Sequence, residues 1–182
     1  EIKSVEYNVI LNAPDVKMIY HDGTRFIATL TDKQGNPIRD AAIEITINGK
    51  TYTKTTDEKG VVSLGLSLDS GIYTVTVNFK GTADYTPITK QAKVTIEPTV
   101  KGLDVVKMFR NGTQYYAIFT DSQGNPLKNK DVQFNINGVF YTKTTNDKGI
   151  AMMGINLNPG KYVITAINLV TCEQSGNNIT VK

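Results

Sequence analysis

The stretch TDKQGNP at residues 31–37 returns as TDSQGNP at residues 120–126, about 89 positions further along the chain. Within it, Gly and Asn favour the backbone angles of a tight turn, and Pro fixes φ before the next segment begins. The identity continues on both sides, because about four in ten positions between residues 22 and 77 match their partners at the same spacing. The chain therefore contains two copies of one unit of about 90 residues.

Alternation of apolar and polar residues predicts strands on both sides of this turn. Residues 25–31 alternate before it, and residues 43–47 alternate after it and end in an Asn-Gly hairpin signal. Residues 5–11 are expected to form a first strand or the tail of a preceding linker, and no segment has helical spacing over the length of a helix. We therefore expect an all-β chain of two tandem immunoglobulin-like β-sandwich domains joined by a short linker. The expected domains are residues 1–98 and 99–182.

Composition excludes several classes of protein. The formal net charge is +3, and the 20 basic residues are scattered along the chain, which argues against a nucleic-acid partner. No apolar run approaches the roughly 20 residues that cross a bilayer, so we expect no membrane contact within this sequence. Cys172 is the single cysteine and has no partner for a disulfide within the chain.

The sequence contains no recognisable catalytic or cofactor-binding motif. His21 is the single histidine and no nucleophile motif accompanies it. Phosphate-loop, zinc and calcium-loop spacings are also absent from the sequence. Asp32 and Asp121 recur at the repeated turn, where a carboxylate usually accepts hydrogen bonds from nearby backbone amides. We expect no enzyme activity, no cofactor and no metal.

A few polar side chains have structural or modification roles to consider. Tyr73 and Tyr162 each follow a turn glycine by two residues, which favours a structural corner with the ring in the core and the hydroxyl on backbone. Asn111 and Asn178 lie in glycosylation sequons, which are meaningful only in a glycosylating exporter. A Lys–Asn isopeptide crosslink is an open alternative in the second repeat, between Lys107 and Asn178.

The residues that carry a family resemblance lie in the second repeat and include 104–115, 124–126, 134–142 and 155–162. In them the second repeat resembles the tandem immunoglobulin-like repeats of adhesin-like surface proteins from methanogenic archaea. The resemblance covers nearly the whole chain and is more divergent in the first repeat. The turn is more distantly similar to the bacterial immunoglobulin-like repeats of invasin and intimin stalks. The resemblance implies an extracellular, cell-surface, non-enzymatic segment of a larger exported protein.

Two functions and one further mode of association follow as hypotheses. The first is an adhesin stalk or binding module whose partner is a surface protein or glycan of another cell. The alternative is a carbohydrate-binding accessory module of a secreted enzyme, although the chain has no Trp for a sugar platform. Self-association is a further hypothesis, through Thr-rich edge strands at 52–56 and 141–145. The candidate binding aromatics are Tyr115, Tyr116, Phe140 and Tyr141.

Overall fold

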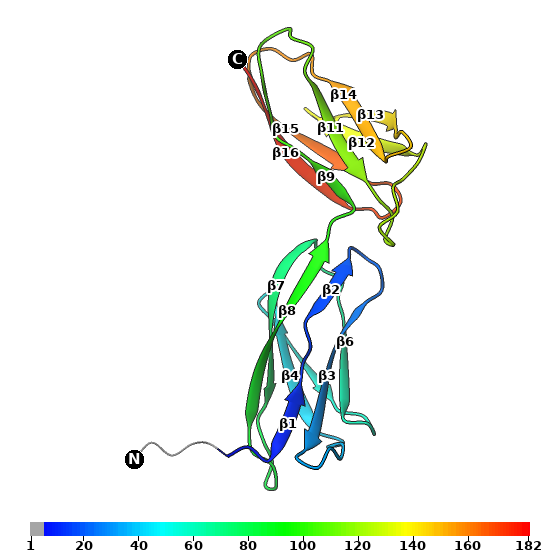
Figure 1. Cartoon of the computed structure of the whole chain (residues 1–182). Coiled ribbons are helices and arrows are strands. Elements are labelled where there is room, and N and C mark those ends of the chain that lie inside the picture. The colour runs from blue at the N-terminus through cyan, green and yellow to red at the C-terminus, as the bar shows by residue number, and fades with distance from the viewer. Residues whose placement is uncertain (1–5) are drawn as a thin grey trace. The chain divides into compact units, whose positions relative to one another are not determined.

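The structure is a computed structural model that describes residues 6–182, and every regular element in that range is a β-strand. The chain forms two compact units. Unit 1 comprises the chain up to Met18 together with Gly23–Ile96, and unit 2 comprises Ile19–Asp22 together with Glu97–Lys182. Within each unit two sheets face each other (Figure 1). The expected all-β fold of two immunoglobulin-like sandwiches is confirmed, and a domain boundary between residues 98 and 99 stays a prediction.

The first repeat forms a three-stranded sheet and a five-stranded sheet. Their orders are β1-β3-β6 and β2-β8-β7-β4-β5, so β5 lies at an open edge. The strands are β1 Val9–Asn12, β2 Val16–Ile19, β3 Arg25–Asp32, β4 Ala42–Ile47, β5 Lys50–Thr55, β6 Val61–Gly65, β7 Gly71–Phe79 and β8 Ile88–Glu97.

The second repeat forms the same pair of sheets. Their orders are β14-β11-β9 and β10-β16-β15-β12-β13, so β13 takes the edge position that β5 has in the first repeat. The strands are β9 Val100–Gly102, β10 Val105–Lys107, β11 Gln114–Phe119, β12 Asp131–Ile136, β13 Val139–Thr144, β14 Ile150–Gly154, β15 Gly160–Ile167 and β16 Gln174–Val181.

The first strand of each repeat is divided between the two sheets, which corrects the single strand expected at residues 5–11. β1 pairs with β3, whereas β2 is the neighbour of β8 in the other sheet. Val5 lies outside the described residues. The chain changes sheet around Pro14, and Leu103 stands at the corresponding position of the second repeat, so a proline is not required for the change. β9 and β10 repeat this change of sheet in the second repeat.

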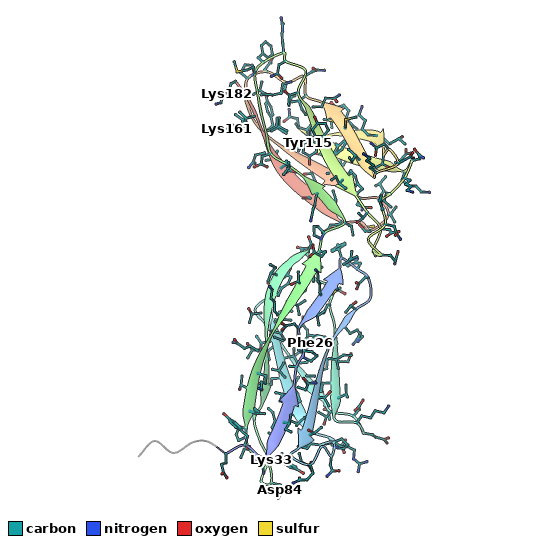
Figure 2. All side chains as sticks on the ribbon, in the orientation of Figure 1. Phe26, Lys33, Asp84, Tyr115, Lys161 and Lys182 are labelled. Carbon is teal, nitrogen blue, oxygen red and sulfur yellow. The ribbon has the colours of Figure 1, made fainter. Side chains whose placement is uncertain are left out.

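Each core is built from alternate residues of the facing strands. Phe26 on β3 and Tyr115 on β11, both labelled in Figure 2, occupy corresponding positions of the two repeats, and both are fully buried. In unit 2 the ring of Phe134 lies edge-on to Tyr115, with ring centroids 5.5 Å apart, and 6.1 Å from the ring of Phe119. Such edge contacts add to the apolar area that these rings remove from water.

The repeated turn has the hydrogen bonds that its sequence predicts. Oδ1 of Asp32 accepts from the backbone N–H groups of Gln34 and Asn36, both at 2.9 Å. Asp121 does the same in unit 2, at the same distances. The bond from the Asn36 backbone N–H contributes most to lowering the pKa of Asp32 below its ordinary value. The interpretation of these aspartates as turn caps is confirmed.

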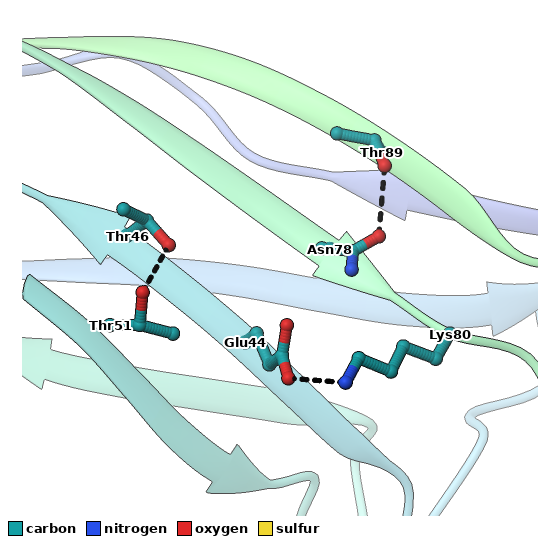
Figure 3. A network of polar contacts seen from close by, with 6 residues as sticks. All are labelled: Glu44, Thr46, Thr51, Asn78, Lys80 and Thr89. Atoms are coloured by element: carbon teal, nitrogen blue, oxygen red, sulfur yellow. Dashed lines mark hydrogen bonds and ion pairs between the residues drawn. The ribbon is translucent and has the colours of Figure 1, made fainter.

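The outer face of the five-stranded sheet in unit 1 carries cross-strand polar pairs (Figure 3). The hydroxyls of Thr46 and Thr51 lie 2.9 Å apart, between β4 and the edge strand β5. Further across the sheet, Thr89 donates to Asn78, and Lys80 lies 2.8 Å from the carboxylate of Glu44. These pairs satisfy the polar side chains on the solvent-facing side of the sheet and link its neighbouring strands.

The strands of the two repeats are joined through Pro98 and Thr99, because β8 ends at Glu97 and β9 begins at Val100. Thr99 is buried in unit 2, where its backbone N–H and its hydroxyl both donate to Oε1 of Glu173. Asn168 donates to the backbone oxygen of Thr99 at 2.9 Å. Buried polar side chains therefore fix the start of the second repeat against its own loop.

Candidate functional site

The described residues contain no group of acidic, His or Cys side chains that could hold a metal ion. Residues 6–182 also include no helix long and apolar enough to cross a membrane. The ring of His21 stacks on Tyr20 at a centroid distance of 3.9 Å, in a turn with positive φ. Cys172 is free and exposed in the loop before β16.

The two corner tyrosines donate hydrogen bonds to backbone, as their position predicts. Tyr73 donates to the carbonyl of Asp69 at 2.7 Å, and Tyr162 donates to the carbonyl of Asn158 at 2.9 Å. Both rings are half-buried. Tyr162 packs against the core of unit 2 from its margin. Their structural interpretation is supported, with less burial than a core ring would have.

Tyr115 is fully buried, so its prediction as an exposed binding aromatic is wrong. Its side chain points between the sheets, and its hydroxyl donates to Oδ1 of Asn177 at 2.7 Å. Burial raises the pKa of the Tyr115 hydroxyl to about 12, and the nearby negative charge of Asp104 adds to this. The pKa of Asp104 is lowered, first by the backbone N–H of Asn178 and then by the Asn177 side chain.

The repeat alignment contains the signal that identifies Tyr115 as a core residue. It occupies the position of Phe26, whose phase in the alternating run of residues 25–31 faces the core. A single strand leaves this phase ambiguous, because Tyr115 and Tyr116 point to opposite faces of the sheet and both are aromatic.

Tyr116 faces outward and lines an apolar cleft on unit 2. The side chain is 56% exposed. The cleft has a volume of about 750 Å³, within the range of ligand sites, and lies between β11 and the segment that contains β9 and β10. Leu103 and Val106 are exposed on its other side. Sequence reasoning missed these two residues because it considered aromatic side chains alone.

Three of the residues that line the cleft differ between the two repeats. At the positions of Leu103, Val106 and Ile118, the first repeat has Pro14, Lys17 and Thr29. Both units nevertheless form the same sheets. Since the sandwich does not need apolar side chains at these positions, the cleft is the best candidate contact surface for a ligand or partner.

Phe140 and Tyr141 belong to β13, on the other sheet of unit 2. They point to opposite faces of that strand and are 61% and 41% exposed. Tyr141 borders a smaller cavity of about 260 Å³ with Lys143. The four candidate aromatics therefore do not form one binding platform.

The two sequons and the crosslink pair have separate surroundings. Asn111 is exposed in the turn after β10, and Asn178 is exposed within β16. Glycosylation of either stays a prediction. Lys107 is buried and donates from Nζ to the carbonyls of Asn111 and Ile155 at 2.8 and 2.6 Å. These bonds hold its amine on backbone oxygens, so the structure does not support a Lys107–Asn178 crosslink.

Comparison with known proteins identifies a relative among bacterial adhesins. No protein-family model matches the chain. The inverse autotransporter adhesin YeeJ of Escherichia coli K12 aligns over 150 residues at 31% identity, which covers 70% of this chain and 6% of that protein. The chain thus spans a small fraction of the relative's length. The similarity supports the prediction of bacterial immunoglobulin-like repeat domains. It does not confirm the predicted resemblance to surface proteins of methanogenic archaea.

Solved structures resemble the chain in fold. Trypsin-activated α2-macroglobulin of Escherichia coli matches with a TM-score of 0.52 at 11% identity, over 96% of this chain and 16% of that one. A 1.5-MDa bacterial ice-binding adhesin matches with a TM-score of 0.39 at 13% identity, over 98% of this chain and 65% of that one. At 11% identity the likeness to the α2-macroglobulin concerns the fold alone.

Proposed function

We propose that the chain is a non-enzymatic segment of an extracellular, cell-surface adhesin, in which the two sandwiches act as stalk units. The observation that carries the proposal is the tandem repetition of one sandwich, joined through two residues, in a chain that aligns with an adhesin over 70% of its length. The finer assignment to surface proteins of methanogenic archaea remains part of the proposal and is supported by the residues of the second repeat alone.

The strand pairing of unit 2 suits a segment that carries tension between its ends. β10 is near the start of the unit and β16 is its last strand, and the two pair in parallel with Val105 opposite Ile179. Force that pulls the two ends of the unit apart would slide these strands along each other. All of their hydrogen bonds are then loaded together, whereas a peeled hairpin breaks its bonds one after another.

The ends of this parallel pair are secured by further contacts. The backbone N–H of Lys182 donates to the carbonyl of Lys107 at 2.9 Å, and that of Phe109 donates to the carbonyl of Lys182 at 2.7 Å. The buried Lys107 amine ties the same segment to the carbonyl of Ile155. A stalk unit without a disulfide needs such attachment of its first strand.

Single-molecule force spectroscopy of the chain, pulled from both ends, tests the stalk function. The carbonyl of Lys107 accepts a hydrogen bond from the N–H of Lys182, so the backbone N–H and C=O of Lys107 point toward β16. The backbone groups of Val105 point the same way, because alternate residues of a strand face the same neighbour. Val105→Pro removes an N–H from this ladder, so we expect a clearly lower unfolding force for unit 2. Val106→Pro is the matched control, because its N–H points away from β16. Equal unfolding forces for Val105→Pro and the parent chain would contradict the proposal.

Carbohydrate binding is the second candidate function, because an exposed Tyr116 lines the cleft near the polar side chains of Lys101, Thr113 and Gln114. Aromatic rings stack on sugar faces and polar groups orient them. A glycan array would show a binder that Tyr116→Ala abolishes and Tyr141→Ala does not. An array without any binder rejects this function and leaves the stalk proposal standing.

A further inference from the structure

The edge strand of unit 2 exposes apolar side chains beside an open backbone. β13 pairs with β12 on one side only. Along it, Val139, Phe140 and Tyr141 are 49%, 61% and 41% exposed. Natural sheets usually guard such an edge with charge, proline or a covering segment, because unpaired N–H and C=O groups are a template for another strand.

The hairpin geometry identifies which backbone groups are open. Asn137 and Gly138 both have positive φ and close a two-residue turn, so Val139 is hydrogen-bonded to Ile136 across the hairpin. At the other end the N–H of Thr145 donates to the carbonyl of Lys130, which places odd-numbered residues toward β12. The outward donors and acceptors therefore belong to the even-numbered residues. These are Phe140, Thr142 and Thr144.

The corresponding edge in unit 1 is polar. The first repeat has Lys50 and Thr51 where the second has Val139 and Phe140. The hydroxyl of Thr51 also shares a hydrogen bond with the hydroxyl of Thr46 on the neighbouring strand (Figure 3). Both edges retain one lysine later in the strand, at Lys54 and Lys143. The same sandwich forms with either edge, so the apolar edge of unit 2 is not required for folding.

We propose that β13 pairs antiparallel with β13 of a second copy of the chain, around a two-fold axis at Tyr141. The outward groups of Phe140 then exchange hydrogen bonds with those of Thr142 in the second copy, and the symmetry repeats this pair. On the core side of the sheet, Tyr141 meets its own counterpart. Val139 lies opposite Lys143 of the second copy.

The charge pattern selects this partner and this strand. In the proposed register no lysine of unit 2 lies opposite another lysine. The same register on β5 would place Lys50 opposite Lys54 twice, and like charges directly opposed destabilise a strand pair. Tyr141 and Lys143 also border the cavity of about 260 Å³ beside β13, which leaves room for the side chains of an added strand. The proposal is independent of the adhesin function.

Sedimentation equilibrium across a wide concentration range tests the pairing, in reducing buffer so that Cys172 forms no disulfide. We expect a reversible dimer in the parent chain. Val139→Lys places one lysine of each copy opposite Lys143 of the other, which makes two like-charged pairs, and it should raise the dissociation constant about tenfold. Adding Lys143→Glu to this variant makes the opposed charges complementary and should restore the dimer. Thr51→Lys, at the position of unit 1 that corresponds to Phe140, is the control that adds a lysine to the other edge strand, and it should leave the dissociation constant unchanged.

Two results would overturn the proposal. One is a monomer at every concentration in the parent chain. The other is a dimer that neither Val139→Lys nor Phe140→Thr weakens, which would place the interface elsewhere, and sensitivity to Tyr116→Ala would then assign it to the cleft. Circular dichroism checks that each variant is folded, and because these side chains are exposed the native fold should be retained.

Discussion

At the residue scale, the two units show two solutions to one packing problem. Unit 2 combines Tyr115, Asn177 and Gly102, and unit 1 has Phe26, Ala92 and Ala13 at the corresponding positions. A Cβ on Gly102 would lie 2.0 Å from the hydroxyl of Tyr115. The glycine therefore makes room for a hydroxyl that the first repeat does not have, and Asn177 accepts its hydrogen bond.

Because the three residues differ together between the units, the effects of substituting them on the stability of unit 2 should be strongly coupled. Gly102→Ala alone should destabilise unit 2 by about 1–3 kcal/mol, because the added methyl overlaps the Tyr115 hydroxyl. Combining it with Tyr115→Phe and Asn177→Ala recreates the set of unit 1 and should recover most of that loss. Differential scanning calorimetry measures both, with the transition of unit 1 as an internal reference. If the triple variant is as unstable as the single one, the three positions are not coupled.

The raised pKa of Tyr115 predicts an alkaline destabilisation of unit 2. The folded state favours the neutral hydroxyl, with a pKa of about 12 against an ordinary value of 10.0. This contribution to stability is therefore complete below pH 10 and is lost as the pH rises toward 12. Melting of the parent and Tyr115→Phe between pH 9 and about 11.5 should show a smaller decline in the variant. Equal declines would mean that other groups carry the effect.

Asp57 in unit 1 and Asn146 in unit 2 accept the same backbone hydrogen bonds in corresponding turns, and only Asp57 carries a charge. Oδ1 of Asp57 accepts from the N–H of Lys59 at 2.8 Å, and Oδ1 of Asn146 accepts from that of Lys148 at 2.9 Å. Hydrogen bonds from backbone, that of Val61 first, lower the pKa of Asp57 below 3.8. The ionised carboxylate therefore stabilises unit 1 above about pH 4, and this contribution is lost as the pH falls through the lowered pKa.

Asp57→Asn should therefore keep the turn and flatten the acid dependence of unit 1. The melting temperature of the variant should fall less than that of the parent between pH 7 and about pH 3. Asn146→Asp is the reverse variant and should add acid dependence to unit 2. A parent and variant with the same acid profile would show that the Asp57 bonds do not favour its charged form.

At the element scale, local patterns predicted the strands that are bounded by turns. The Asn-Gly hairpins, the repeated turn at residues 31–37 and the edge strands β5 and β13 all have short-range signals. The division of the first strand has none, because β1 pairs with β3 and β2 joins β8, and both partners are remote in sequence. The apolar cleft was missed for a similar reason. It is assembled from β11 and the distant segment around Leu103.

The corner at the start of β15 gives a prediction at this scale. Tyr162→Phe removes the bond to the Asn158 carbonyl and should cost about 1 kcal/mol of unfolding free energy. Tyr162→Ala should cost roughly 2–3 kcal/mol, below the range for a fully buried ring, because Tyr162 is half-buried at the margin of the core. Tyr73 provides the same pair of variants in unit 1. Urea unfolding that is unchanged in both alanine variants would show that these tyrosines are surface groups.

At the scale of the whole molecule, the repeat is what made the fold predictable, because each unit checks the interpretation of the other. Comparing the two repeats says less about function than about fold. The features that both units share serve the sandwich, as Asp32 and Asp121 do in the turn. The features that differ, the cleft around Tyr116 and the edge at Phe140, are the candidates for contact, and single substitutions of surface residues leave no periodic trace in a sequence.

The stability of the whole chain should depend little on redox state or salt. Cys172 is the single cysteine and is exposed, so it closes no bond within the chain. Among the described residues the ion pair of Glu44 with Lys80 joins a half-buried carboxylate to an exposed lysine, and salt screens pairs that reach the surface. Stability therefore comes from the two apolar cores, and the melting temperatures of both units should change little with a reducing agent or with added sodium chloride. Cys172→Ser is the control. A melting temperature that falls on reduction in the parent but not in this variant would reveal a disulfide between chains.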